Sequence, residues 1–132
     1  TEPVSALIAA CKHLGIKRLA FLSPYIAEVS FHLREVLDGE GVATPVFGSF
    51  SEGIEEKVVR IDGLSIINAA LDLCKDADVD GLFLSCTNLR TLDVIAPLEV
   101  ALDIPVLSSN LVLGWHLCQR GNVPFNGLGK LG

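Results

Sequence analysis

The sequence has few of the residues that nucleic-acid binding or membrane insertion requires. Only 10 of its 132 residues are Lys or Arg, against 16 Asp and Glu, which gives a net charge of −6. Contacts to phosphate need clustered basic side chains, and Lys17-Arg18 is the only adjacent basic pair. No apolar run is long enough to cross a bilayer. These features argue against nucleic acid and membrane as partners.

Metal-binding cysteine patterns are also absent. The chain has four cysteines, and none forms a C-x-x-C pair or lies at the usual metal-ligand spacing from a His. The sequence therefore predicts no metal site. Scattered cysteines in an acidic chain are typical of a reducing compartment, so we expect a cytoplasmic protein.

Met is missing altogether, even at position 1, and the chain starts in what reads as the first turn of a helix. We expect both ends to be cuts within a longer protein. Hydrophobic residues make up 50% of the chain, with a mean hydropathy of +0.50. Such a content favours a parallel sheet buried on both faces, or a surface covered by another lobe or subunit. We therefore expect a homo-oligomer, or a lobe that packs on a missing partner lobe.

Segments typical of buried strands alternate with segments typical of amphipathic helices. This alternation predicts right-handed βαβ units and a parallel sheet. We expect one three-layer, flavodoxin-like α/β lobe, with a four-stranded sheet in the order 2-1-3-4 and helices on both faces. Pro45 lacks an N–H, so its strand is expected at an edge. The predicted strands are 18–23, 42–50, 81–85 and 105–108, and the predicted helices are 3–14, 27–37, 64–74, 92–102 and 111–119.

Residues suited to proton or anion chemistry follow three of these strands, in segments 23–25, 85–88 and 108–110. Ligands of open α/β sheets bind at the carboxyl ends of strands. Cys86 lies between a strand end and a helix start, where backbone N–H groups and the helix dipole lower the pKa of a thiol. As a thiolate it can act as nucleophile or proton acceptor, and as a thiol it can donate a proton. A buried structural cysteine is the alternative.

Neighbouring residues can bind a small carboxylate. Thr87 and Asn88 can present amides and side chains to a carboxylate or enolate oxygen. The phenol of Tyr25 can bond a carboxylate, or its ring can simply fill the top of the sheet. Asn110 can bind substrate, but capping of the last helix is slightly favoured.

The other polar and reactive residues are assigned to structure. The three histidines fall within predicted helices, away from the strand ends, which indicates packing or a helix surface. Three cysteines fall on apolar helical faces and are expected in the core. Two serines at the end of the last strand read as turn residues. These residues are His13, His32, His116, Cys11, Cys74, Cys118, Ser108 and Ser109.

The run from Phe83 to Thr91, with Ser85-Cys86-Thr87-Asn88 at its centre, resembles the second-cysteine motif of the aspartate/glutamate racemase superfamily. Residues 106–110 with Trp115-His116-Leu117, and residues 23–25, are similar to the matching segments. Among members, the maleate cis-trans isomerases and the ectoine-utilisation protein A group share these motifs most closely. The resemblance covers nearly the whole chain.

The resemblance implies two similar α/β lobes with the active site between them, one cysteine from each lobe and no cofactor. It implies that residues 1–132 are the second lobe, that Cys86 is its cysteine and that Tyr25 binds a substrate carboxylate, with help from the amides near Thr87. The first lobe, with its cysteine, lies outside this chain, so the isolated lobe is expected to be inactive.

The resulting prediction is a cysteine-dependent isomerase or racemase that acts on a small carboxylate or dicarboxylate. One departure puts maleate in doubt, because the segment 51–59 has no Asn where maleate isomerases use one. Arylmalonate decarboxylases share the fold and keep only the second-lobe cysteine, so decarboxylation is an alternative. A non-catalytic module that binds a small ligand is the third reading.

Overall fold

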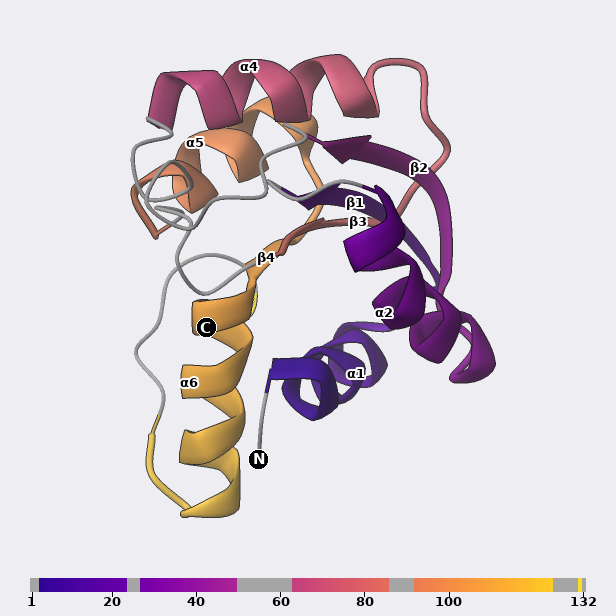
Figure 1. The fold of residues 1–132 in the computed structure, drawn as a ribbon. Coiled ribbons are helices and arrows are strands. Elements are labelled where there is room, and N and C mark those ends of the chain that lie inside the picture. The colour runs from indigo at the N-terminus through magenta and orange to yellow at the C-terminus, as the bar shows by residue number, and fades with distance from the viewer. Residues whose placement is uncertain (1–2, 24–26, 50–62, 86–91, 125–130, 132) are drawn as a thin grey trace.

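The computed structural model describes residues 3–23, 27–49, 63–85, 92–124 and 131. Its centre is a four-stranded parallel sheet in the order β2-β1-β3-β4 (Figure 1). The predicted fold class and strand order are confirmed. The strands are β1 (Arg18–Ser23), β2 (Ala43–Ser49), β3 (Gly81–Leu84) and β4 (Val106–Ser108).

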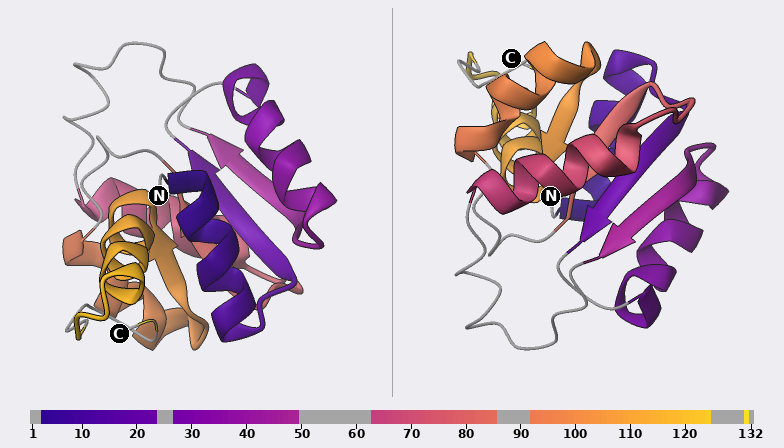
Figure 2. Two further views of the ribbon diagram at one scale, coloured as in Figure 1. Left: turned by 90° about the horizontal axis from the view of Figure 1, so that it is seen from below. Right: turned by 90° about the horizontal axis from the view of Figure 1, so that it is seen from above.

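Helices cover both faces of the sheet and make three layers (Figures 1 and 2). α4 (Gly63–Cys74) and α5 (Leu92–Leu102) pack on one face. α1 (Pro3–Leu14), α2 (Ala27–Gly39) and α6 (Ser109–Arg120) lie on the other, where α1 packs against α6. Among the described residues, no helix has the length and apolar character needed to cross a membrane.

β2 is an edge strand, as Pro45 predicted. Its register with β1 shifts between the pairs Arg18–Ala43 and Ala20–Val46, so two residues of β2 face one residue of β1. Pro45 lies in this irregularity. A residue without an N–H is tolerated there because a bulge at an edge needs no ladder bond from it.

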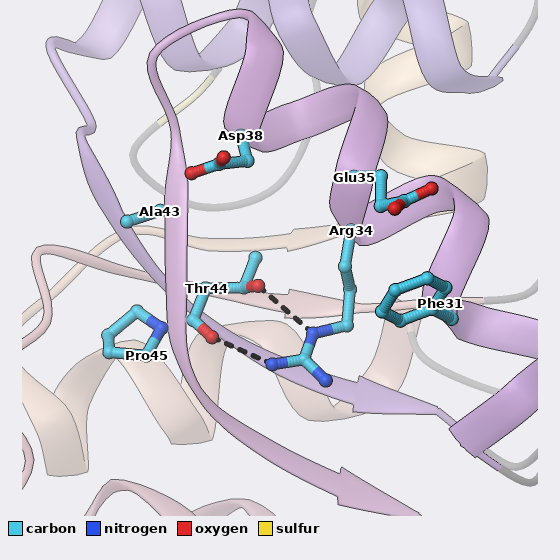
Figure 3. A pocket seen from close by; sticks show the side chains of 7 residues that line it. All are labelled: Phe31, Arg34, Glu35, Asp38, Ala43, Thr44 and Pro45. Carbon is cyan, nitrogen blue, oxygen red and sulfur yellow. Dashed lines mark hydrogen bonds between the residues drawn. The ribbon is translucent and has the colours of Figure 1, made fainter.

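A side chain from α2 covers part of this edge. Arg34 donates from Nε to Thr44 Oγ1 and from a terminal nitrogen to the Thr44 carbonyl oxygen, both at 3.0 Å (Figure 3). Its guanidinium carbon also lies 4.7 Å from the centre of the Phe47 ring. These contacts satisfy polar groups that an open edge strand would offer to another chain.

The amino ends of the two central strands are tied together by Asp80. Its carboxylate accepts hydrogen bonds from the backbone N–H groups of Lys17, at 3.2 Å, and Arg18, at 2.9 Å. The Asp80 N–H in turn donates to the Arg18 carbonyl at 2.8 Å. This link fixes the start of β3 against the start of β1, and so sets the level at which both strands end.

Three phenylalanines form a row across the sheet. Phe21 is the register partner of both Phe47 and Phe83, and its ring centre lies 5.8 Å from the first and 5.3 Å from the second. Phe21 and Phe83 are buried almost completely. Arg34 of α2 lies over Phe47, so the row is on the sheet face that α1, α2 and α6 cover.

Candidate functional site

The carboxyl ends of β1, β3 and β4 lie side by side. Leu22 pairs with Leu84, and Leu84 pairs with Ser108, so the three strands end at nearly the same level. The sheet therefore places Ser23, Ser85 and the start of helix α6 along one edge. Parallel sheets bind ligands at this edge, where helix N-termini and loop amides gather.

Four of the five predicted site residues lie outside the described residues. They are Tyr25, Cys86, Thr87 and Asn88. The fifth, Asn110, is the second residue of α6, and its side chain is exposed at the same edge of the sheet.

Ser108 caps helix α6, which corrects the expectation that Asn110 does so. Ser108 has extended backbone angles, and its hydroxyl accepts a hydrogen bond from the Leu111 N–H at 3.1 Å. Ser108 and Ser109 are buried, so they are more than turn residues. The prediction was wrong because Ser and Asn are equally good caps, and the helix begins two residues before its apolar pattern does.

We expect Ser108→Ala to lower the free energy of unfolding by about 1 kcal/mol, because the Leu111 N–H loses its acceptor. Urea unfolding followed by circular dichroism measures this change. The matched control is Asn110→Ala, which changes an exposed residue of the same helix turn and should have a smaller effect. Equal losses in both variants would contradict the assignment of the cap.

Two of the other thiols are poorly suited to reaction. Cys11 on α1 is wholly buried, and burial, with a smaller contribution from the charge of Asp80, raises its pKa to about 12. Burial also raises the pKa of Cys74 on α4. Both were expected in the core, and both are there. Cys118 on α6 is only partly buried, which corrects its assignment to the core.

The raised pKa of Cys11 predicts a loss of stability in alkali. Above the ordinary pKa of 9.0 the unfolded chain releases the thiol proton, whereas the folded chain keeps it until about pH 12. The folded state then binds more protons, so the free energy of unfolding should fall between these values, with a limiting slope of about 1.4 kcal/mol per pH unit. Urea titrations at several pH values measure the slope. In Cys11→Ala it should be shallower, and an unchanged slope would contradict the prediction.

The histidines have structural surroundings, as predicted. The ring of His13 on α1 lies 5.2 Å from the ring of Trp115 on α6, and His116 lies 5.9 Å from the same indole. His32 is exposed on α2. Within the described ranges, no three His, Cys, Asp or Glu side chains are grouped so as to hold a metal ion.

Two pockets formed by described residues lie away from the carboxyl ends of the strands. The first, of about 340 Å³, opens between α2 and the first half of β2, beside Arg34 and Phe31 (Figure 3). The second, of about 460 Å³, borders Lys17 and Val42, which directly precede β1 and β2. Neither adjoins the strand ends that carry the predicted site.

A buried serine at the carboxyl edge was named from the sequence only as part of the segment 23–25, with no role of its own. Ser23 ends β1 and is wholly buried. It lies two residues beyond Phe21, and the same Phe-x-Ser pattern ends β2 at Ser49 and continues β3 to Ser85. This triple repeat at three strand ends is the signal that could have identified it.

Comparison with known proteins gives a match over nearly the whole chain. A protein-family model described as arylmalonate decarboxylase matches residues 2–131. The arylmalonate decarboxylase of Bordetella bronchiseptica is 34% identical over 141 residues, which cover 99% of this chain and 56% of that protein. The chain therefore spans about half the length of this relative.

Solved structures of two kinds share the fold. A crystal structure of arylmalonate decarboxylase is 30% identical, with a TM-score of 0.85, over 98% of this chain and 58% of that one. The maleate cis-trans isomerase of Nocardia farcinica, bound to TRIS, is 23% identical with a TM-score of 0.93. The match covers 99% of this chain and 54% of that one. The maleate isomerase of Pseudomonas putida S16 is 22% identical with a TM-score of 0.92, over 98% of this chain and 53% of that one. The sequence motifs indicated the maleate isomerases as the nearer group and the arylmalonate decarboxylases as an alternative on the same fold. The family match and the 34% identity favour the alternative.

Proposed function

Because the chain belongs to the arylmalonate decarboxylase family, we propose that the intact protein containing it removes one carboxyl group from an aryl-substituted malonate without a cofactor. The observation that carries this proposal is the family match over residues 2–131, together with 34% identity to a decarboxylase. The chain covers about half of its relatives' length. We therefore assign it to one lobe of a two-lobe enzyme and ascribe the activity to the whole.

In the proposed reaction Cys86 is the proton donor. The bond between the α-carbon and one carboxylate breaks, CO₂ leaves, and the electron pair stays on the substrate as an enediolate. The Cys86 thiol then gives its proton to the α-carbon, and the thiolate takes a proton from water. The net change is one malonate and one proton converted into one monocarboxylate and CO₂. The position of Cys86 directly after Ser85 supports this role, because Ser85 continues β3 at the carboxyl edge of the sheet.

The remaining carboxylate, whose two oxygens carry the negative charge of the enediolate, needs hydrogen-bond donors. We assign this role to Tyr25, Thr87 and Asn88, which follow the carboxyl ends of β1 and β3 in the chain, and to Asn110 in the first turn of α6. Donors placed where charge develops lower the barrier most when they are fixed before the reaction begins.

A decarboxylase needs fewer catalytic thiols than a racemase of the two-thiol kind. It requires one thiol, which Cys86 supplies. A racemase or isomerase of the two-thiol kind needs a second thiol at the same edge, and the thiols of Cys11 and Cys74 are buried within helices and held protonated. The likeness to the maleate isomerases, at 22–23% identity, extends to the fold alone.

The test is a product assay on the intact protein after dialysis against EDTA. Phenylmalonate should yield phenylacetate and CO₂, measured by proton NMR and a coupled CO₂ assay, while maleate should remain unchanged. Formation of fumarate from maleate without release of CO₂ would favour the isomerase instead. Saturable binding of phenylmalonate with no turnover would favour a non-catalytic ligand-binding module.

A further inference from the structure

Helix α6 has apolar side chains on two opposite sides. The buried side includes Leu111, Val112 and Trp115, and the helix packs on α1 and β4. Leu113 and Leu117 stand two residues before and two residues after Trp115, so they lie on the other side of the helix. Leu113 is half-buried and Leu117 is 55% exposed. The outward side of a surface helix is usually polar, and here its centre consists of two leucines.

Val123 extends this apolar surface beyond the end of the helix. Its N–H donates to the Cys118 carbonyl oxygen at 2.9 Å, which folds the chain back against the last turn of α6. A Cβ atom added at Gly121 would lie 3.7 Å from a methyl carbon of Val123 and 3.4 Å from the Leu117 carbonyl oxygen. Val123 is 57% exposed. We call Leu113, Leu117 and Val123 the α6 outer stripe.

The distribution of charge distinguishes this stripe from an ordinary water-facing surface. The chain has 16 Asp and Glu residues, and none of them lies in α6, whose only charged residue is the last one, Arg120. The exposed ring of Phe31 on α2, by contrast, lines its pocket together with the carboxylates of Glu35 and Asp38. The buried centre of a protein interface is depleted of charged residues. The lack of charge on α6 therefore favours a covered surface.

The outer stripe is continuous with the edge of the sheet that carries the proposed site. α6 begins directly after Ser108, the last residue of β4, and Asn110 in its first turn is exposed. The helix then runs away from the sheet, with α1 along one flank (Figures 1 and 2). A ligand site buries most of its ligand, so the open edge of one sheet needs a second wall. Any chain that covers the outer stripe is also close enough to supply that wall.

We propose that the α6 outer stripe is the surface on which the remaining half of the intact protein packs, through an apolar face of its own. This inference rests on the proposed function, because it names the partner that completes the site. The occupant is the same polypeptide, since this chain spans only 56% of the decarboxylase relative and 58% of a solved decarboxylase. A tethered lobe has a high effective concentration, so it occupies the stripe in preference to a second copy.

The test measures how fast single cysteines on the stripe react in the intact protein. Leu117→Cys and Val123→Cys are made separately in a Cys118→Ala background, so that the other members of the stripe keep their contacts. Cysteine is itself a small apolar residue and costs little in such a place. The control is Asp72→Cys, an exposed position near the carboxyl end of α4, on the other face of the sheet. Leu117 has a similar place near the carboxyl end of α6, so the helix dipole acts alike on both thiols.

Alkylation by iodoacetamide is followed by mass spectrometry of the labelled peptide, and each rate is divided by the rate for the same variant in urea. We expect this ratio to be at least about 10-fold lower for Leu117→Cys and Val123→Cys than for Asp72→Cys, because covered thiols react only when the cover opens. Dilution of the protein by about 100-fold should leave the ratios unchanged, since contact within one polypeptide does not depend on concentration.

Ratios equal to that of Asp72→Cys at both stripe positions would overturn the proposal, because they would show that the stripe faces water. Protection that disappears on dilution would also overturn it, and would identify a second copy as the occupant. Failure of the proposed function looks different. If the wild-type protein releases no CO₂ from phenylmalonate, the decarboxylase assignment is wrong, while the labelling ratios still decide whether the stripe is covered.

Discussion

Replacement of Cys86 by alanine in the intact protein should lower kcat for CO₂ release by at least about 1,000-fold. A positioned proton donor contributes on the order of 10² to 10⁴ to a rate, and no other thiol of the described chain lies at the carboxyl edge to replace it. KM should change little, because the thiol is assigned to protonation of the α-carbon, whereas other residues are assigned to binding the substrate carboxylate. Steady-state assays with phenylmalonate give both constants.

The matched control for this experiment is Cys118→Ala. Cys118 is the most accessible of the described thiols, and it lies on α6 among residues assigned to packing. Its removal should leave kcat within about twofold of wild type, as expected for a surface substitution away from a site. A Cys86→Ala variant that retained wild-type kcat would show that another group donates the proton.

Replacement of Phe21 by alanine should give the largest loss of stability, about 3–5 kcal/mol, because it opens a cavity at the centre of the core. Phe21 is wholly buried in the central strand β1, and its ring contacts Phe47 on one side and Phe83 on the other. Such a loss is a large part of the usual stability of a single domain. The midpoint of urea unfolding should therefore fall sharply.

Phe31→Ala is the control for the same change in side chain. Phe31 lies on α2 at the rim of the pocket beside β2, and it is 59% exposed (Figure 3). Its truncation creates no enclosed cavity, so the free energy of unfolding should change by about 0.5 kcal/mol or less. Equal losses of stability in the two variants would contradict the prediction, because they would show that burial of the Phe21 ring adds nothing to the stability of the fold.

The sequence by itself determined the layered fold and the order of the strands. Buried strands read as short apolar runs and helices as amphipathic segments, and both patterns are local. Right-handed crossovers then leave few ways to assemble the alternating elements, and Pro45 marked β2 as an edge strand. The sequence also indicated that the polar segments after β1, β3 and β4 share one edge, because parallel strands end together.

Tertiary structure alone decided how those ends are aligned. Ser108 caps α6 because the helix begins two residues before its apolar pattern does. The local sequence does not encode this shift of the helix start. Cys118 proved partly exposed because burial depends on what packs over a helix face. The pairing of Leu22 with Leu84, which sets Ser23 beside Ser85, joins residues about sixty positions apart in the chain. Strand register of this kind is fixed by packing and by links such as Asp80 to Arg18, and periodicity within one strand carries no information about its neighbour.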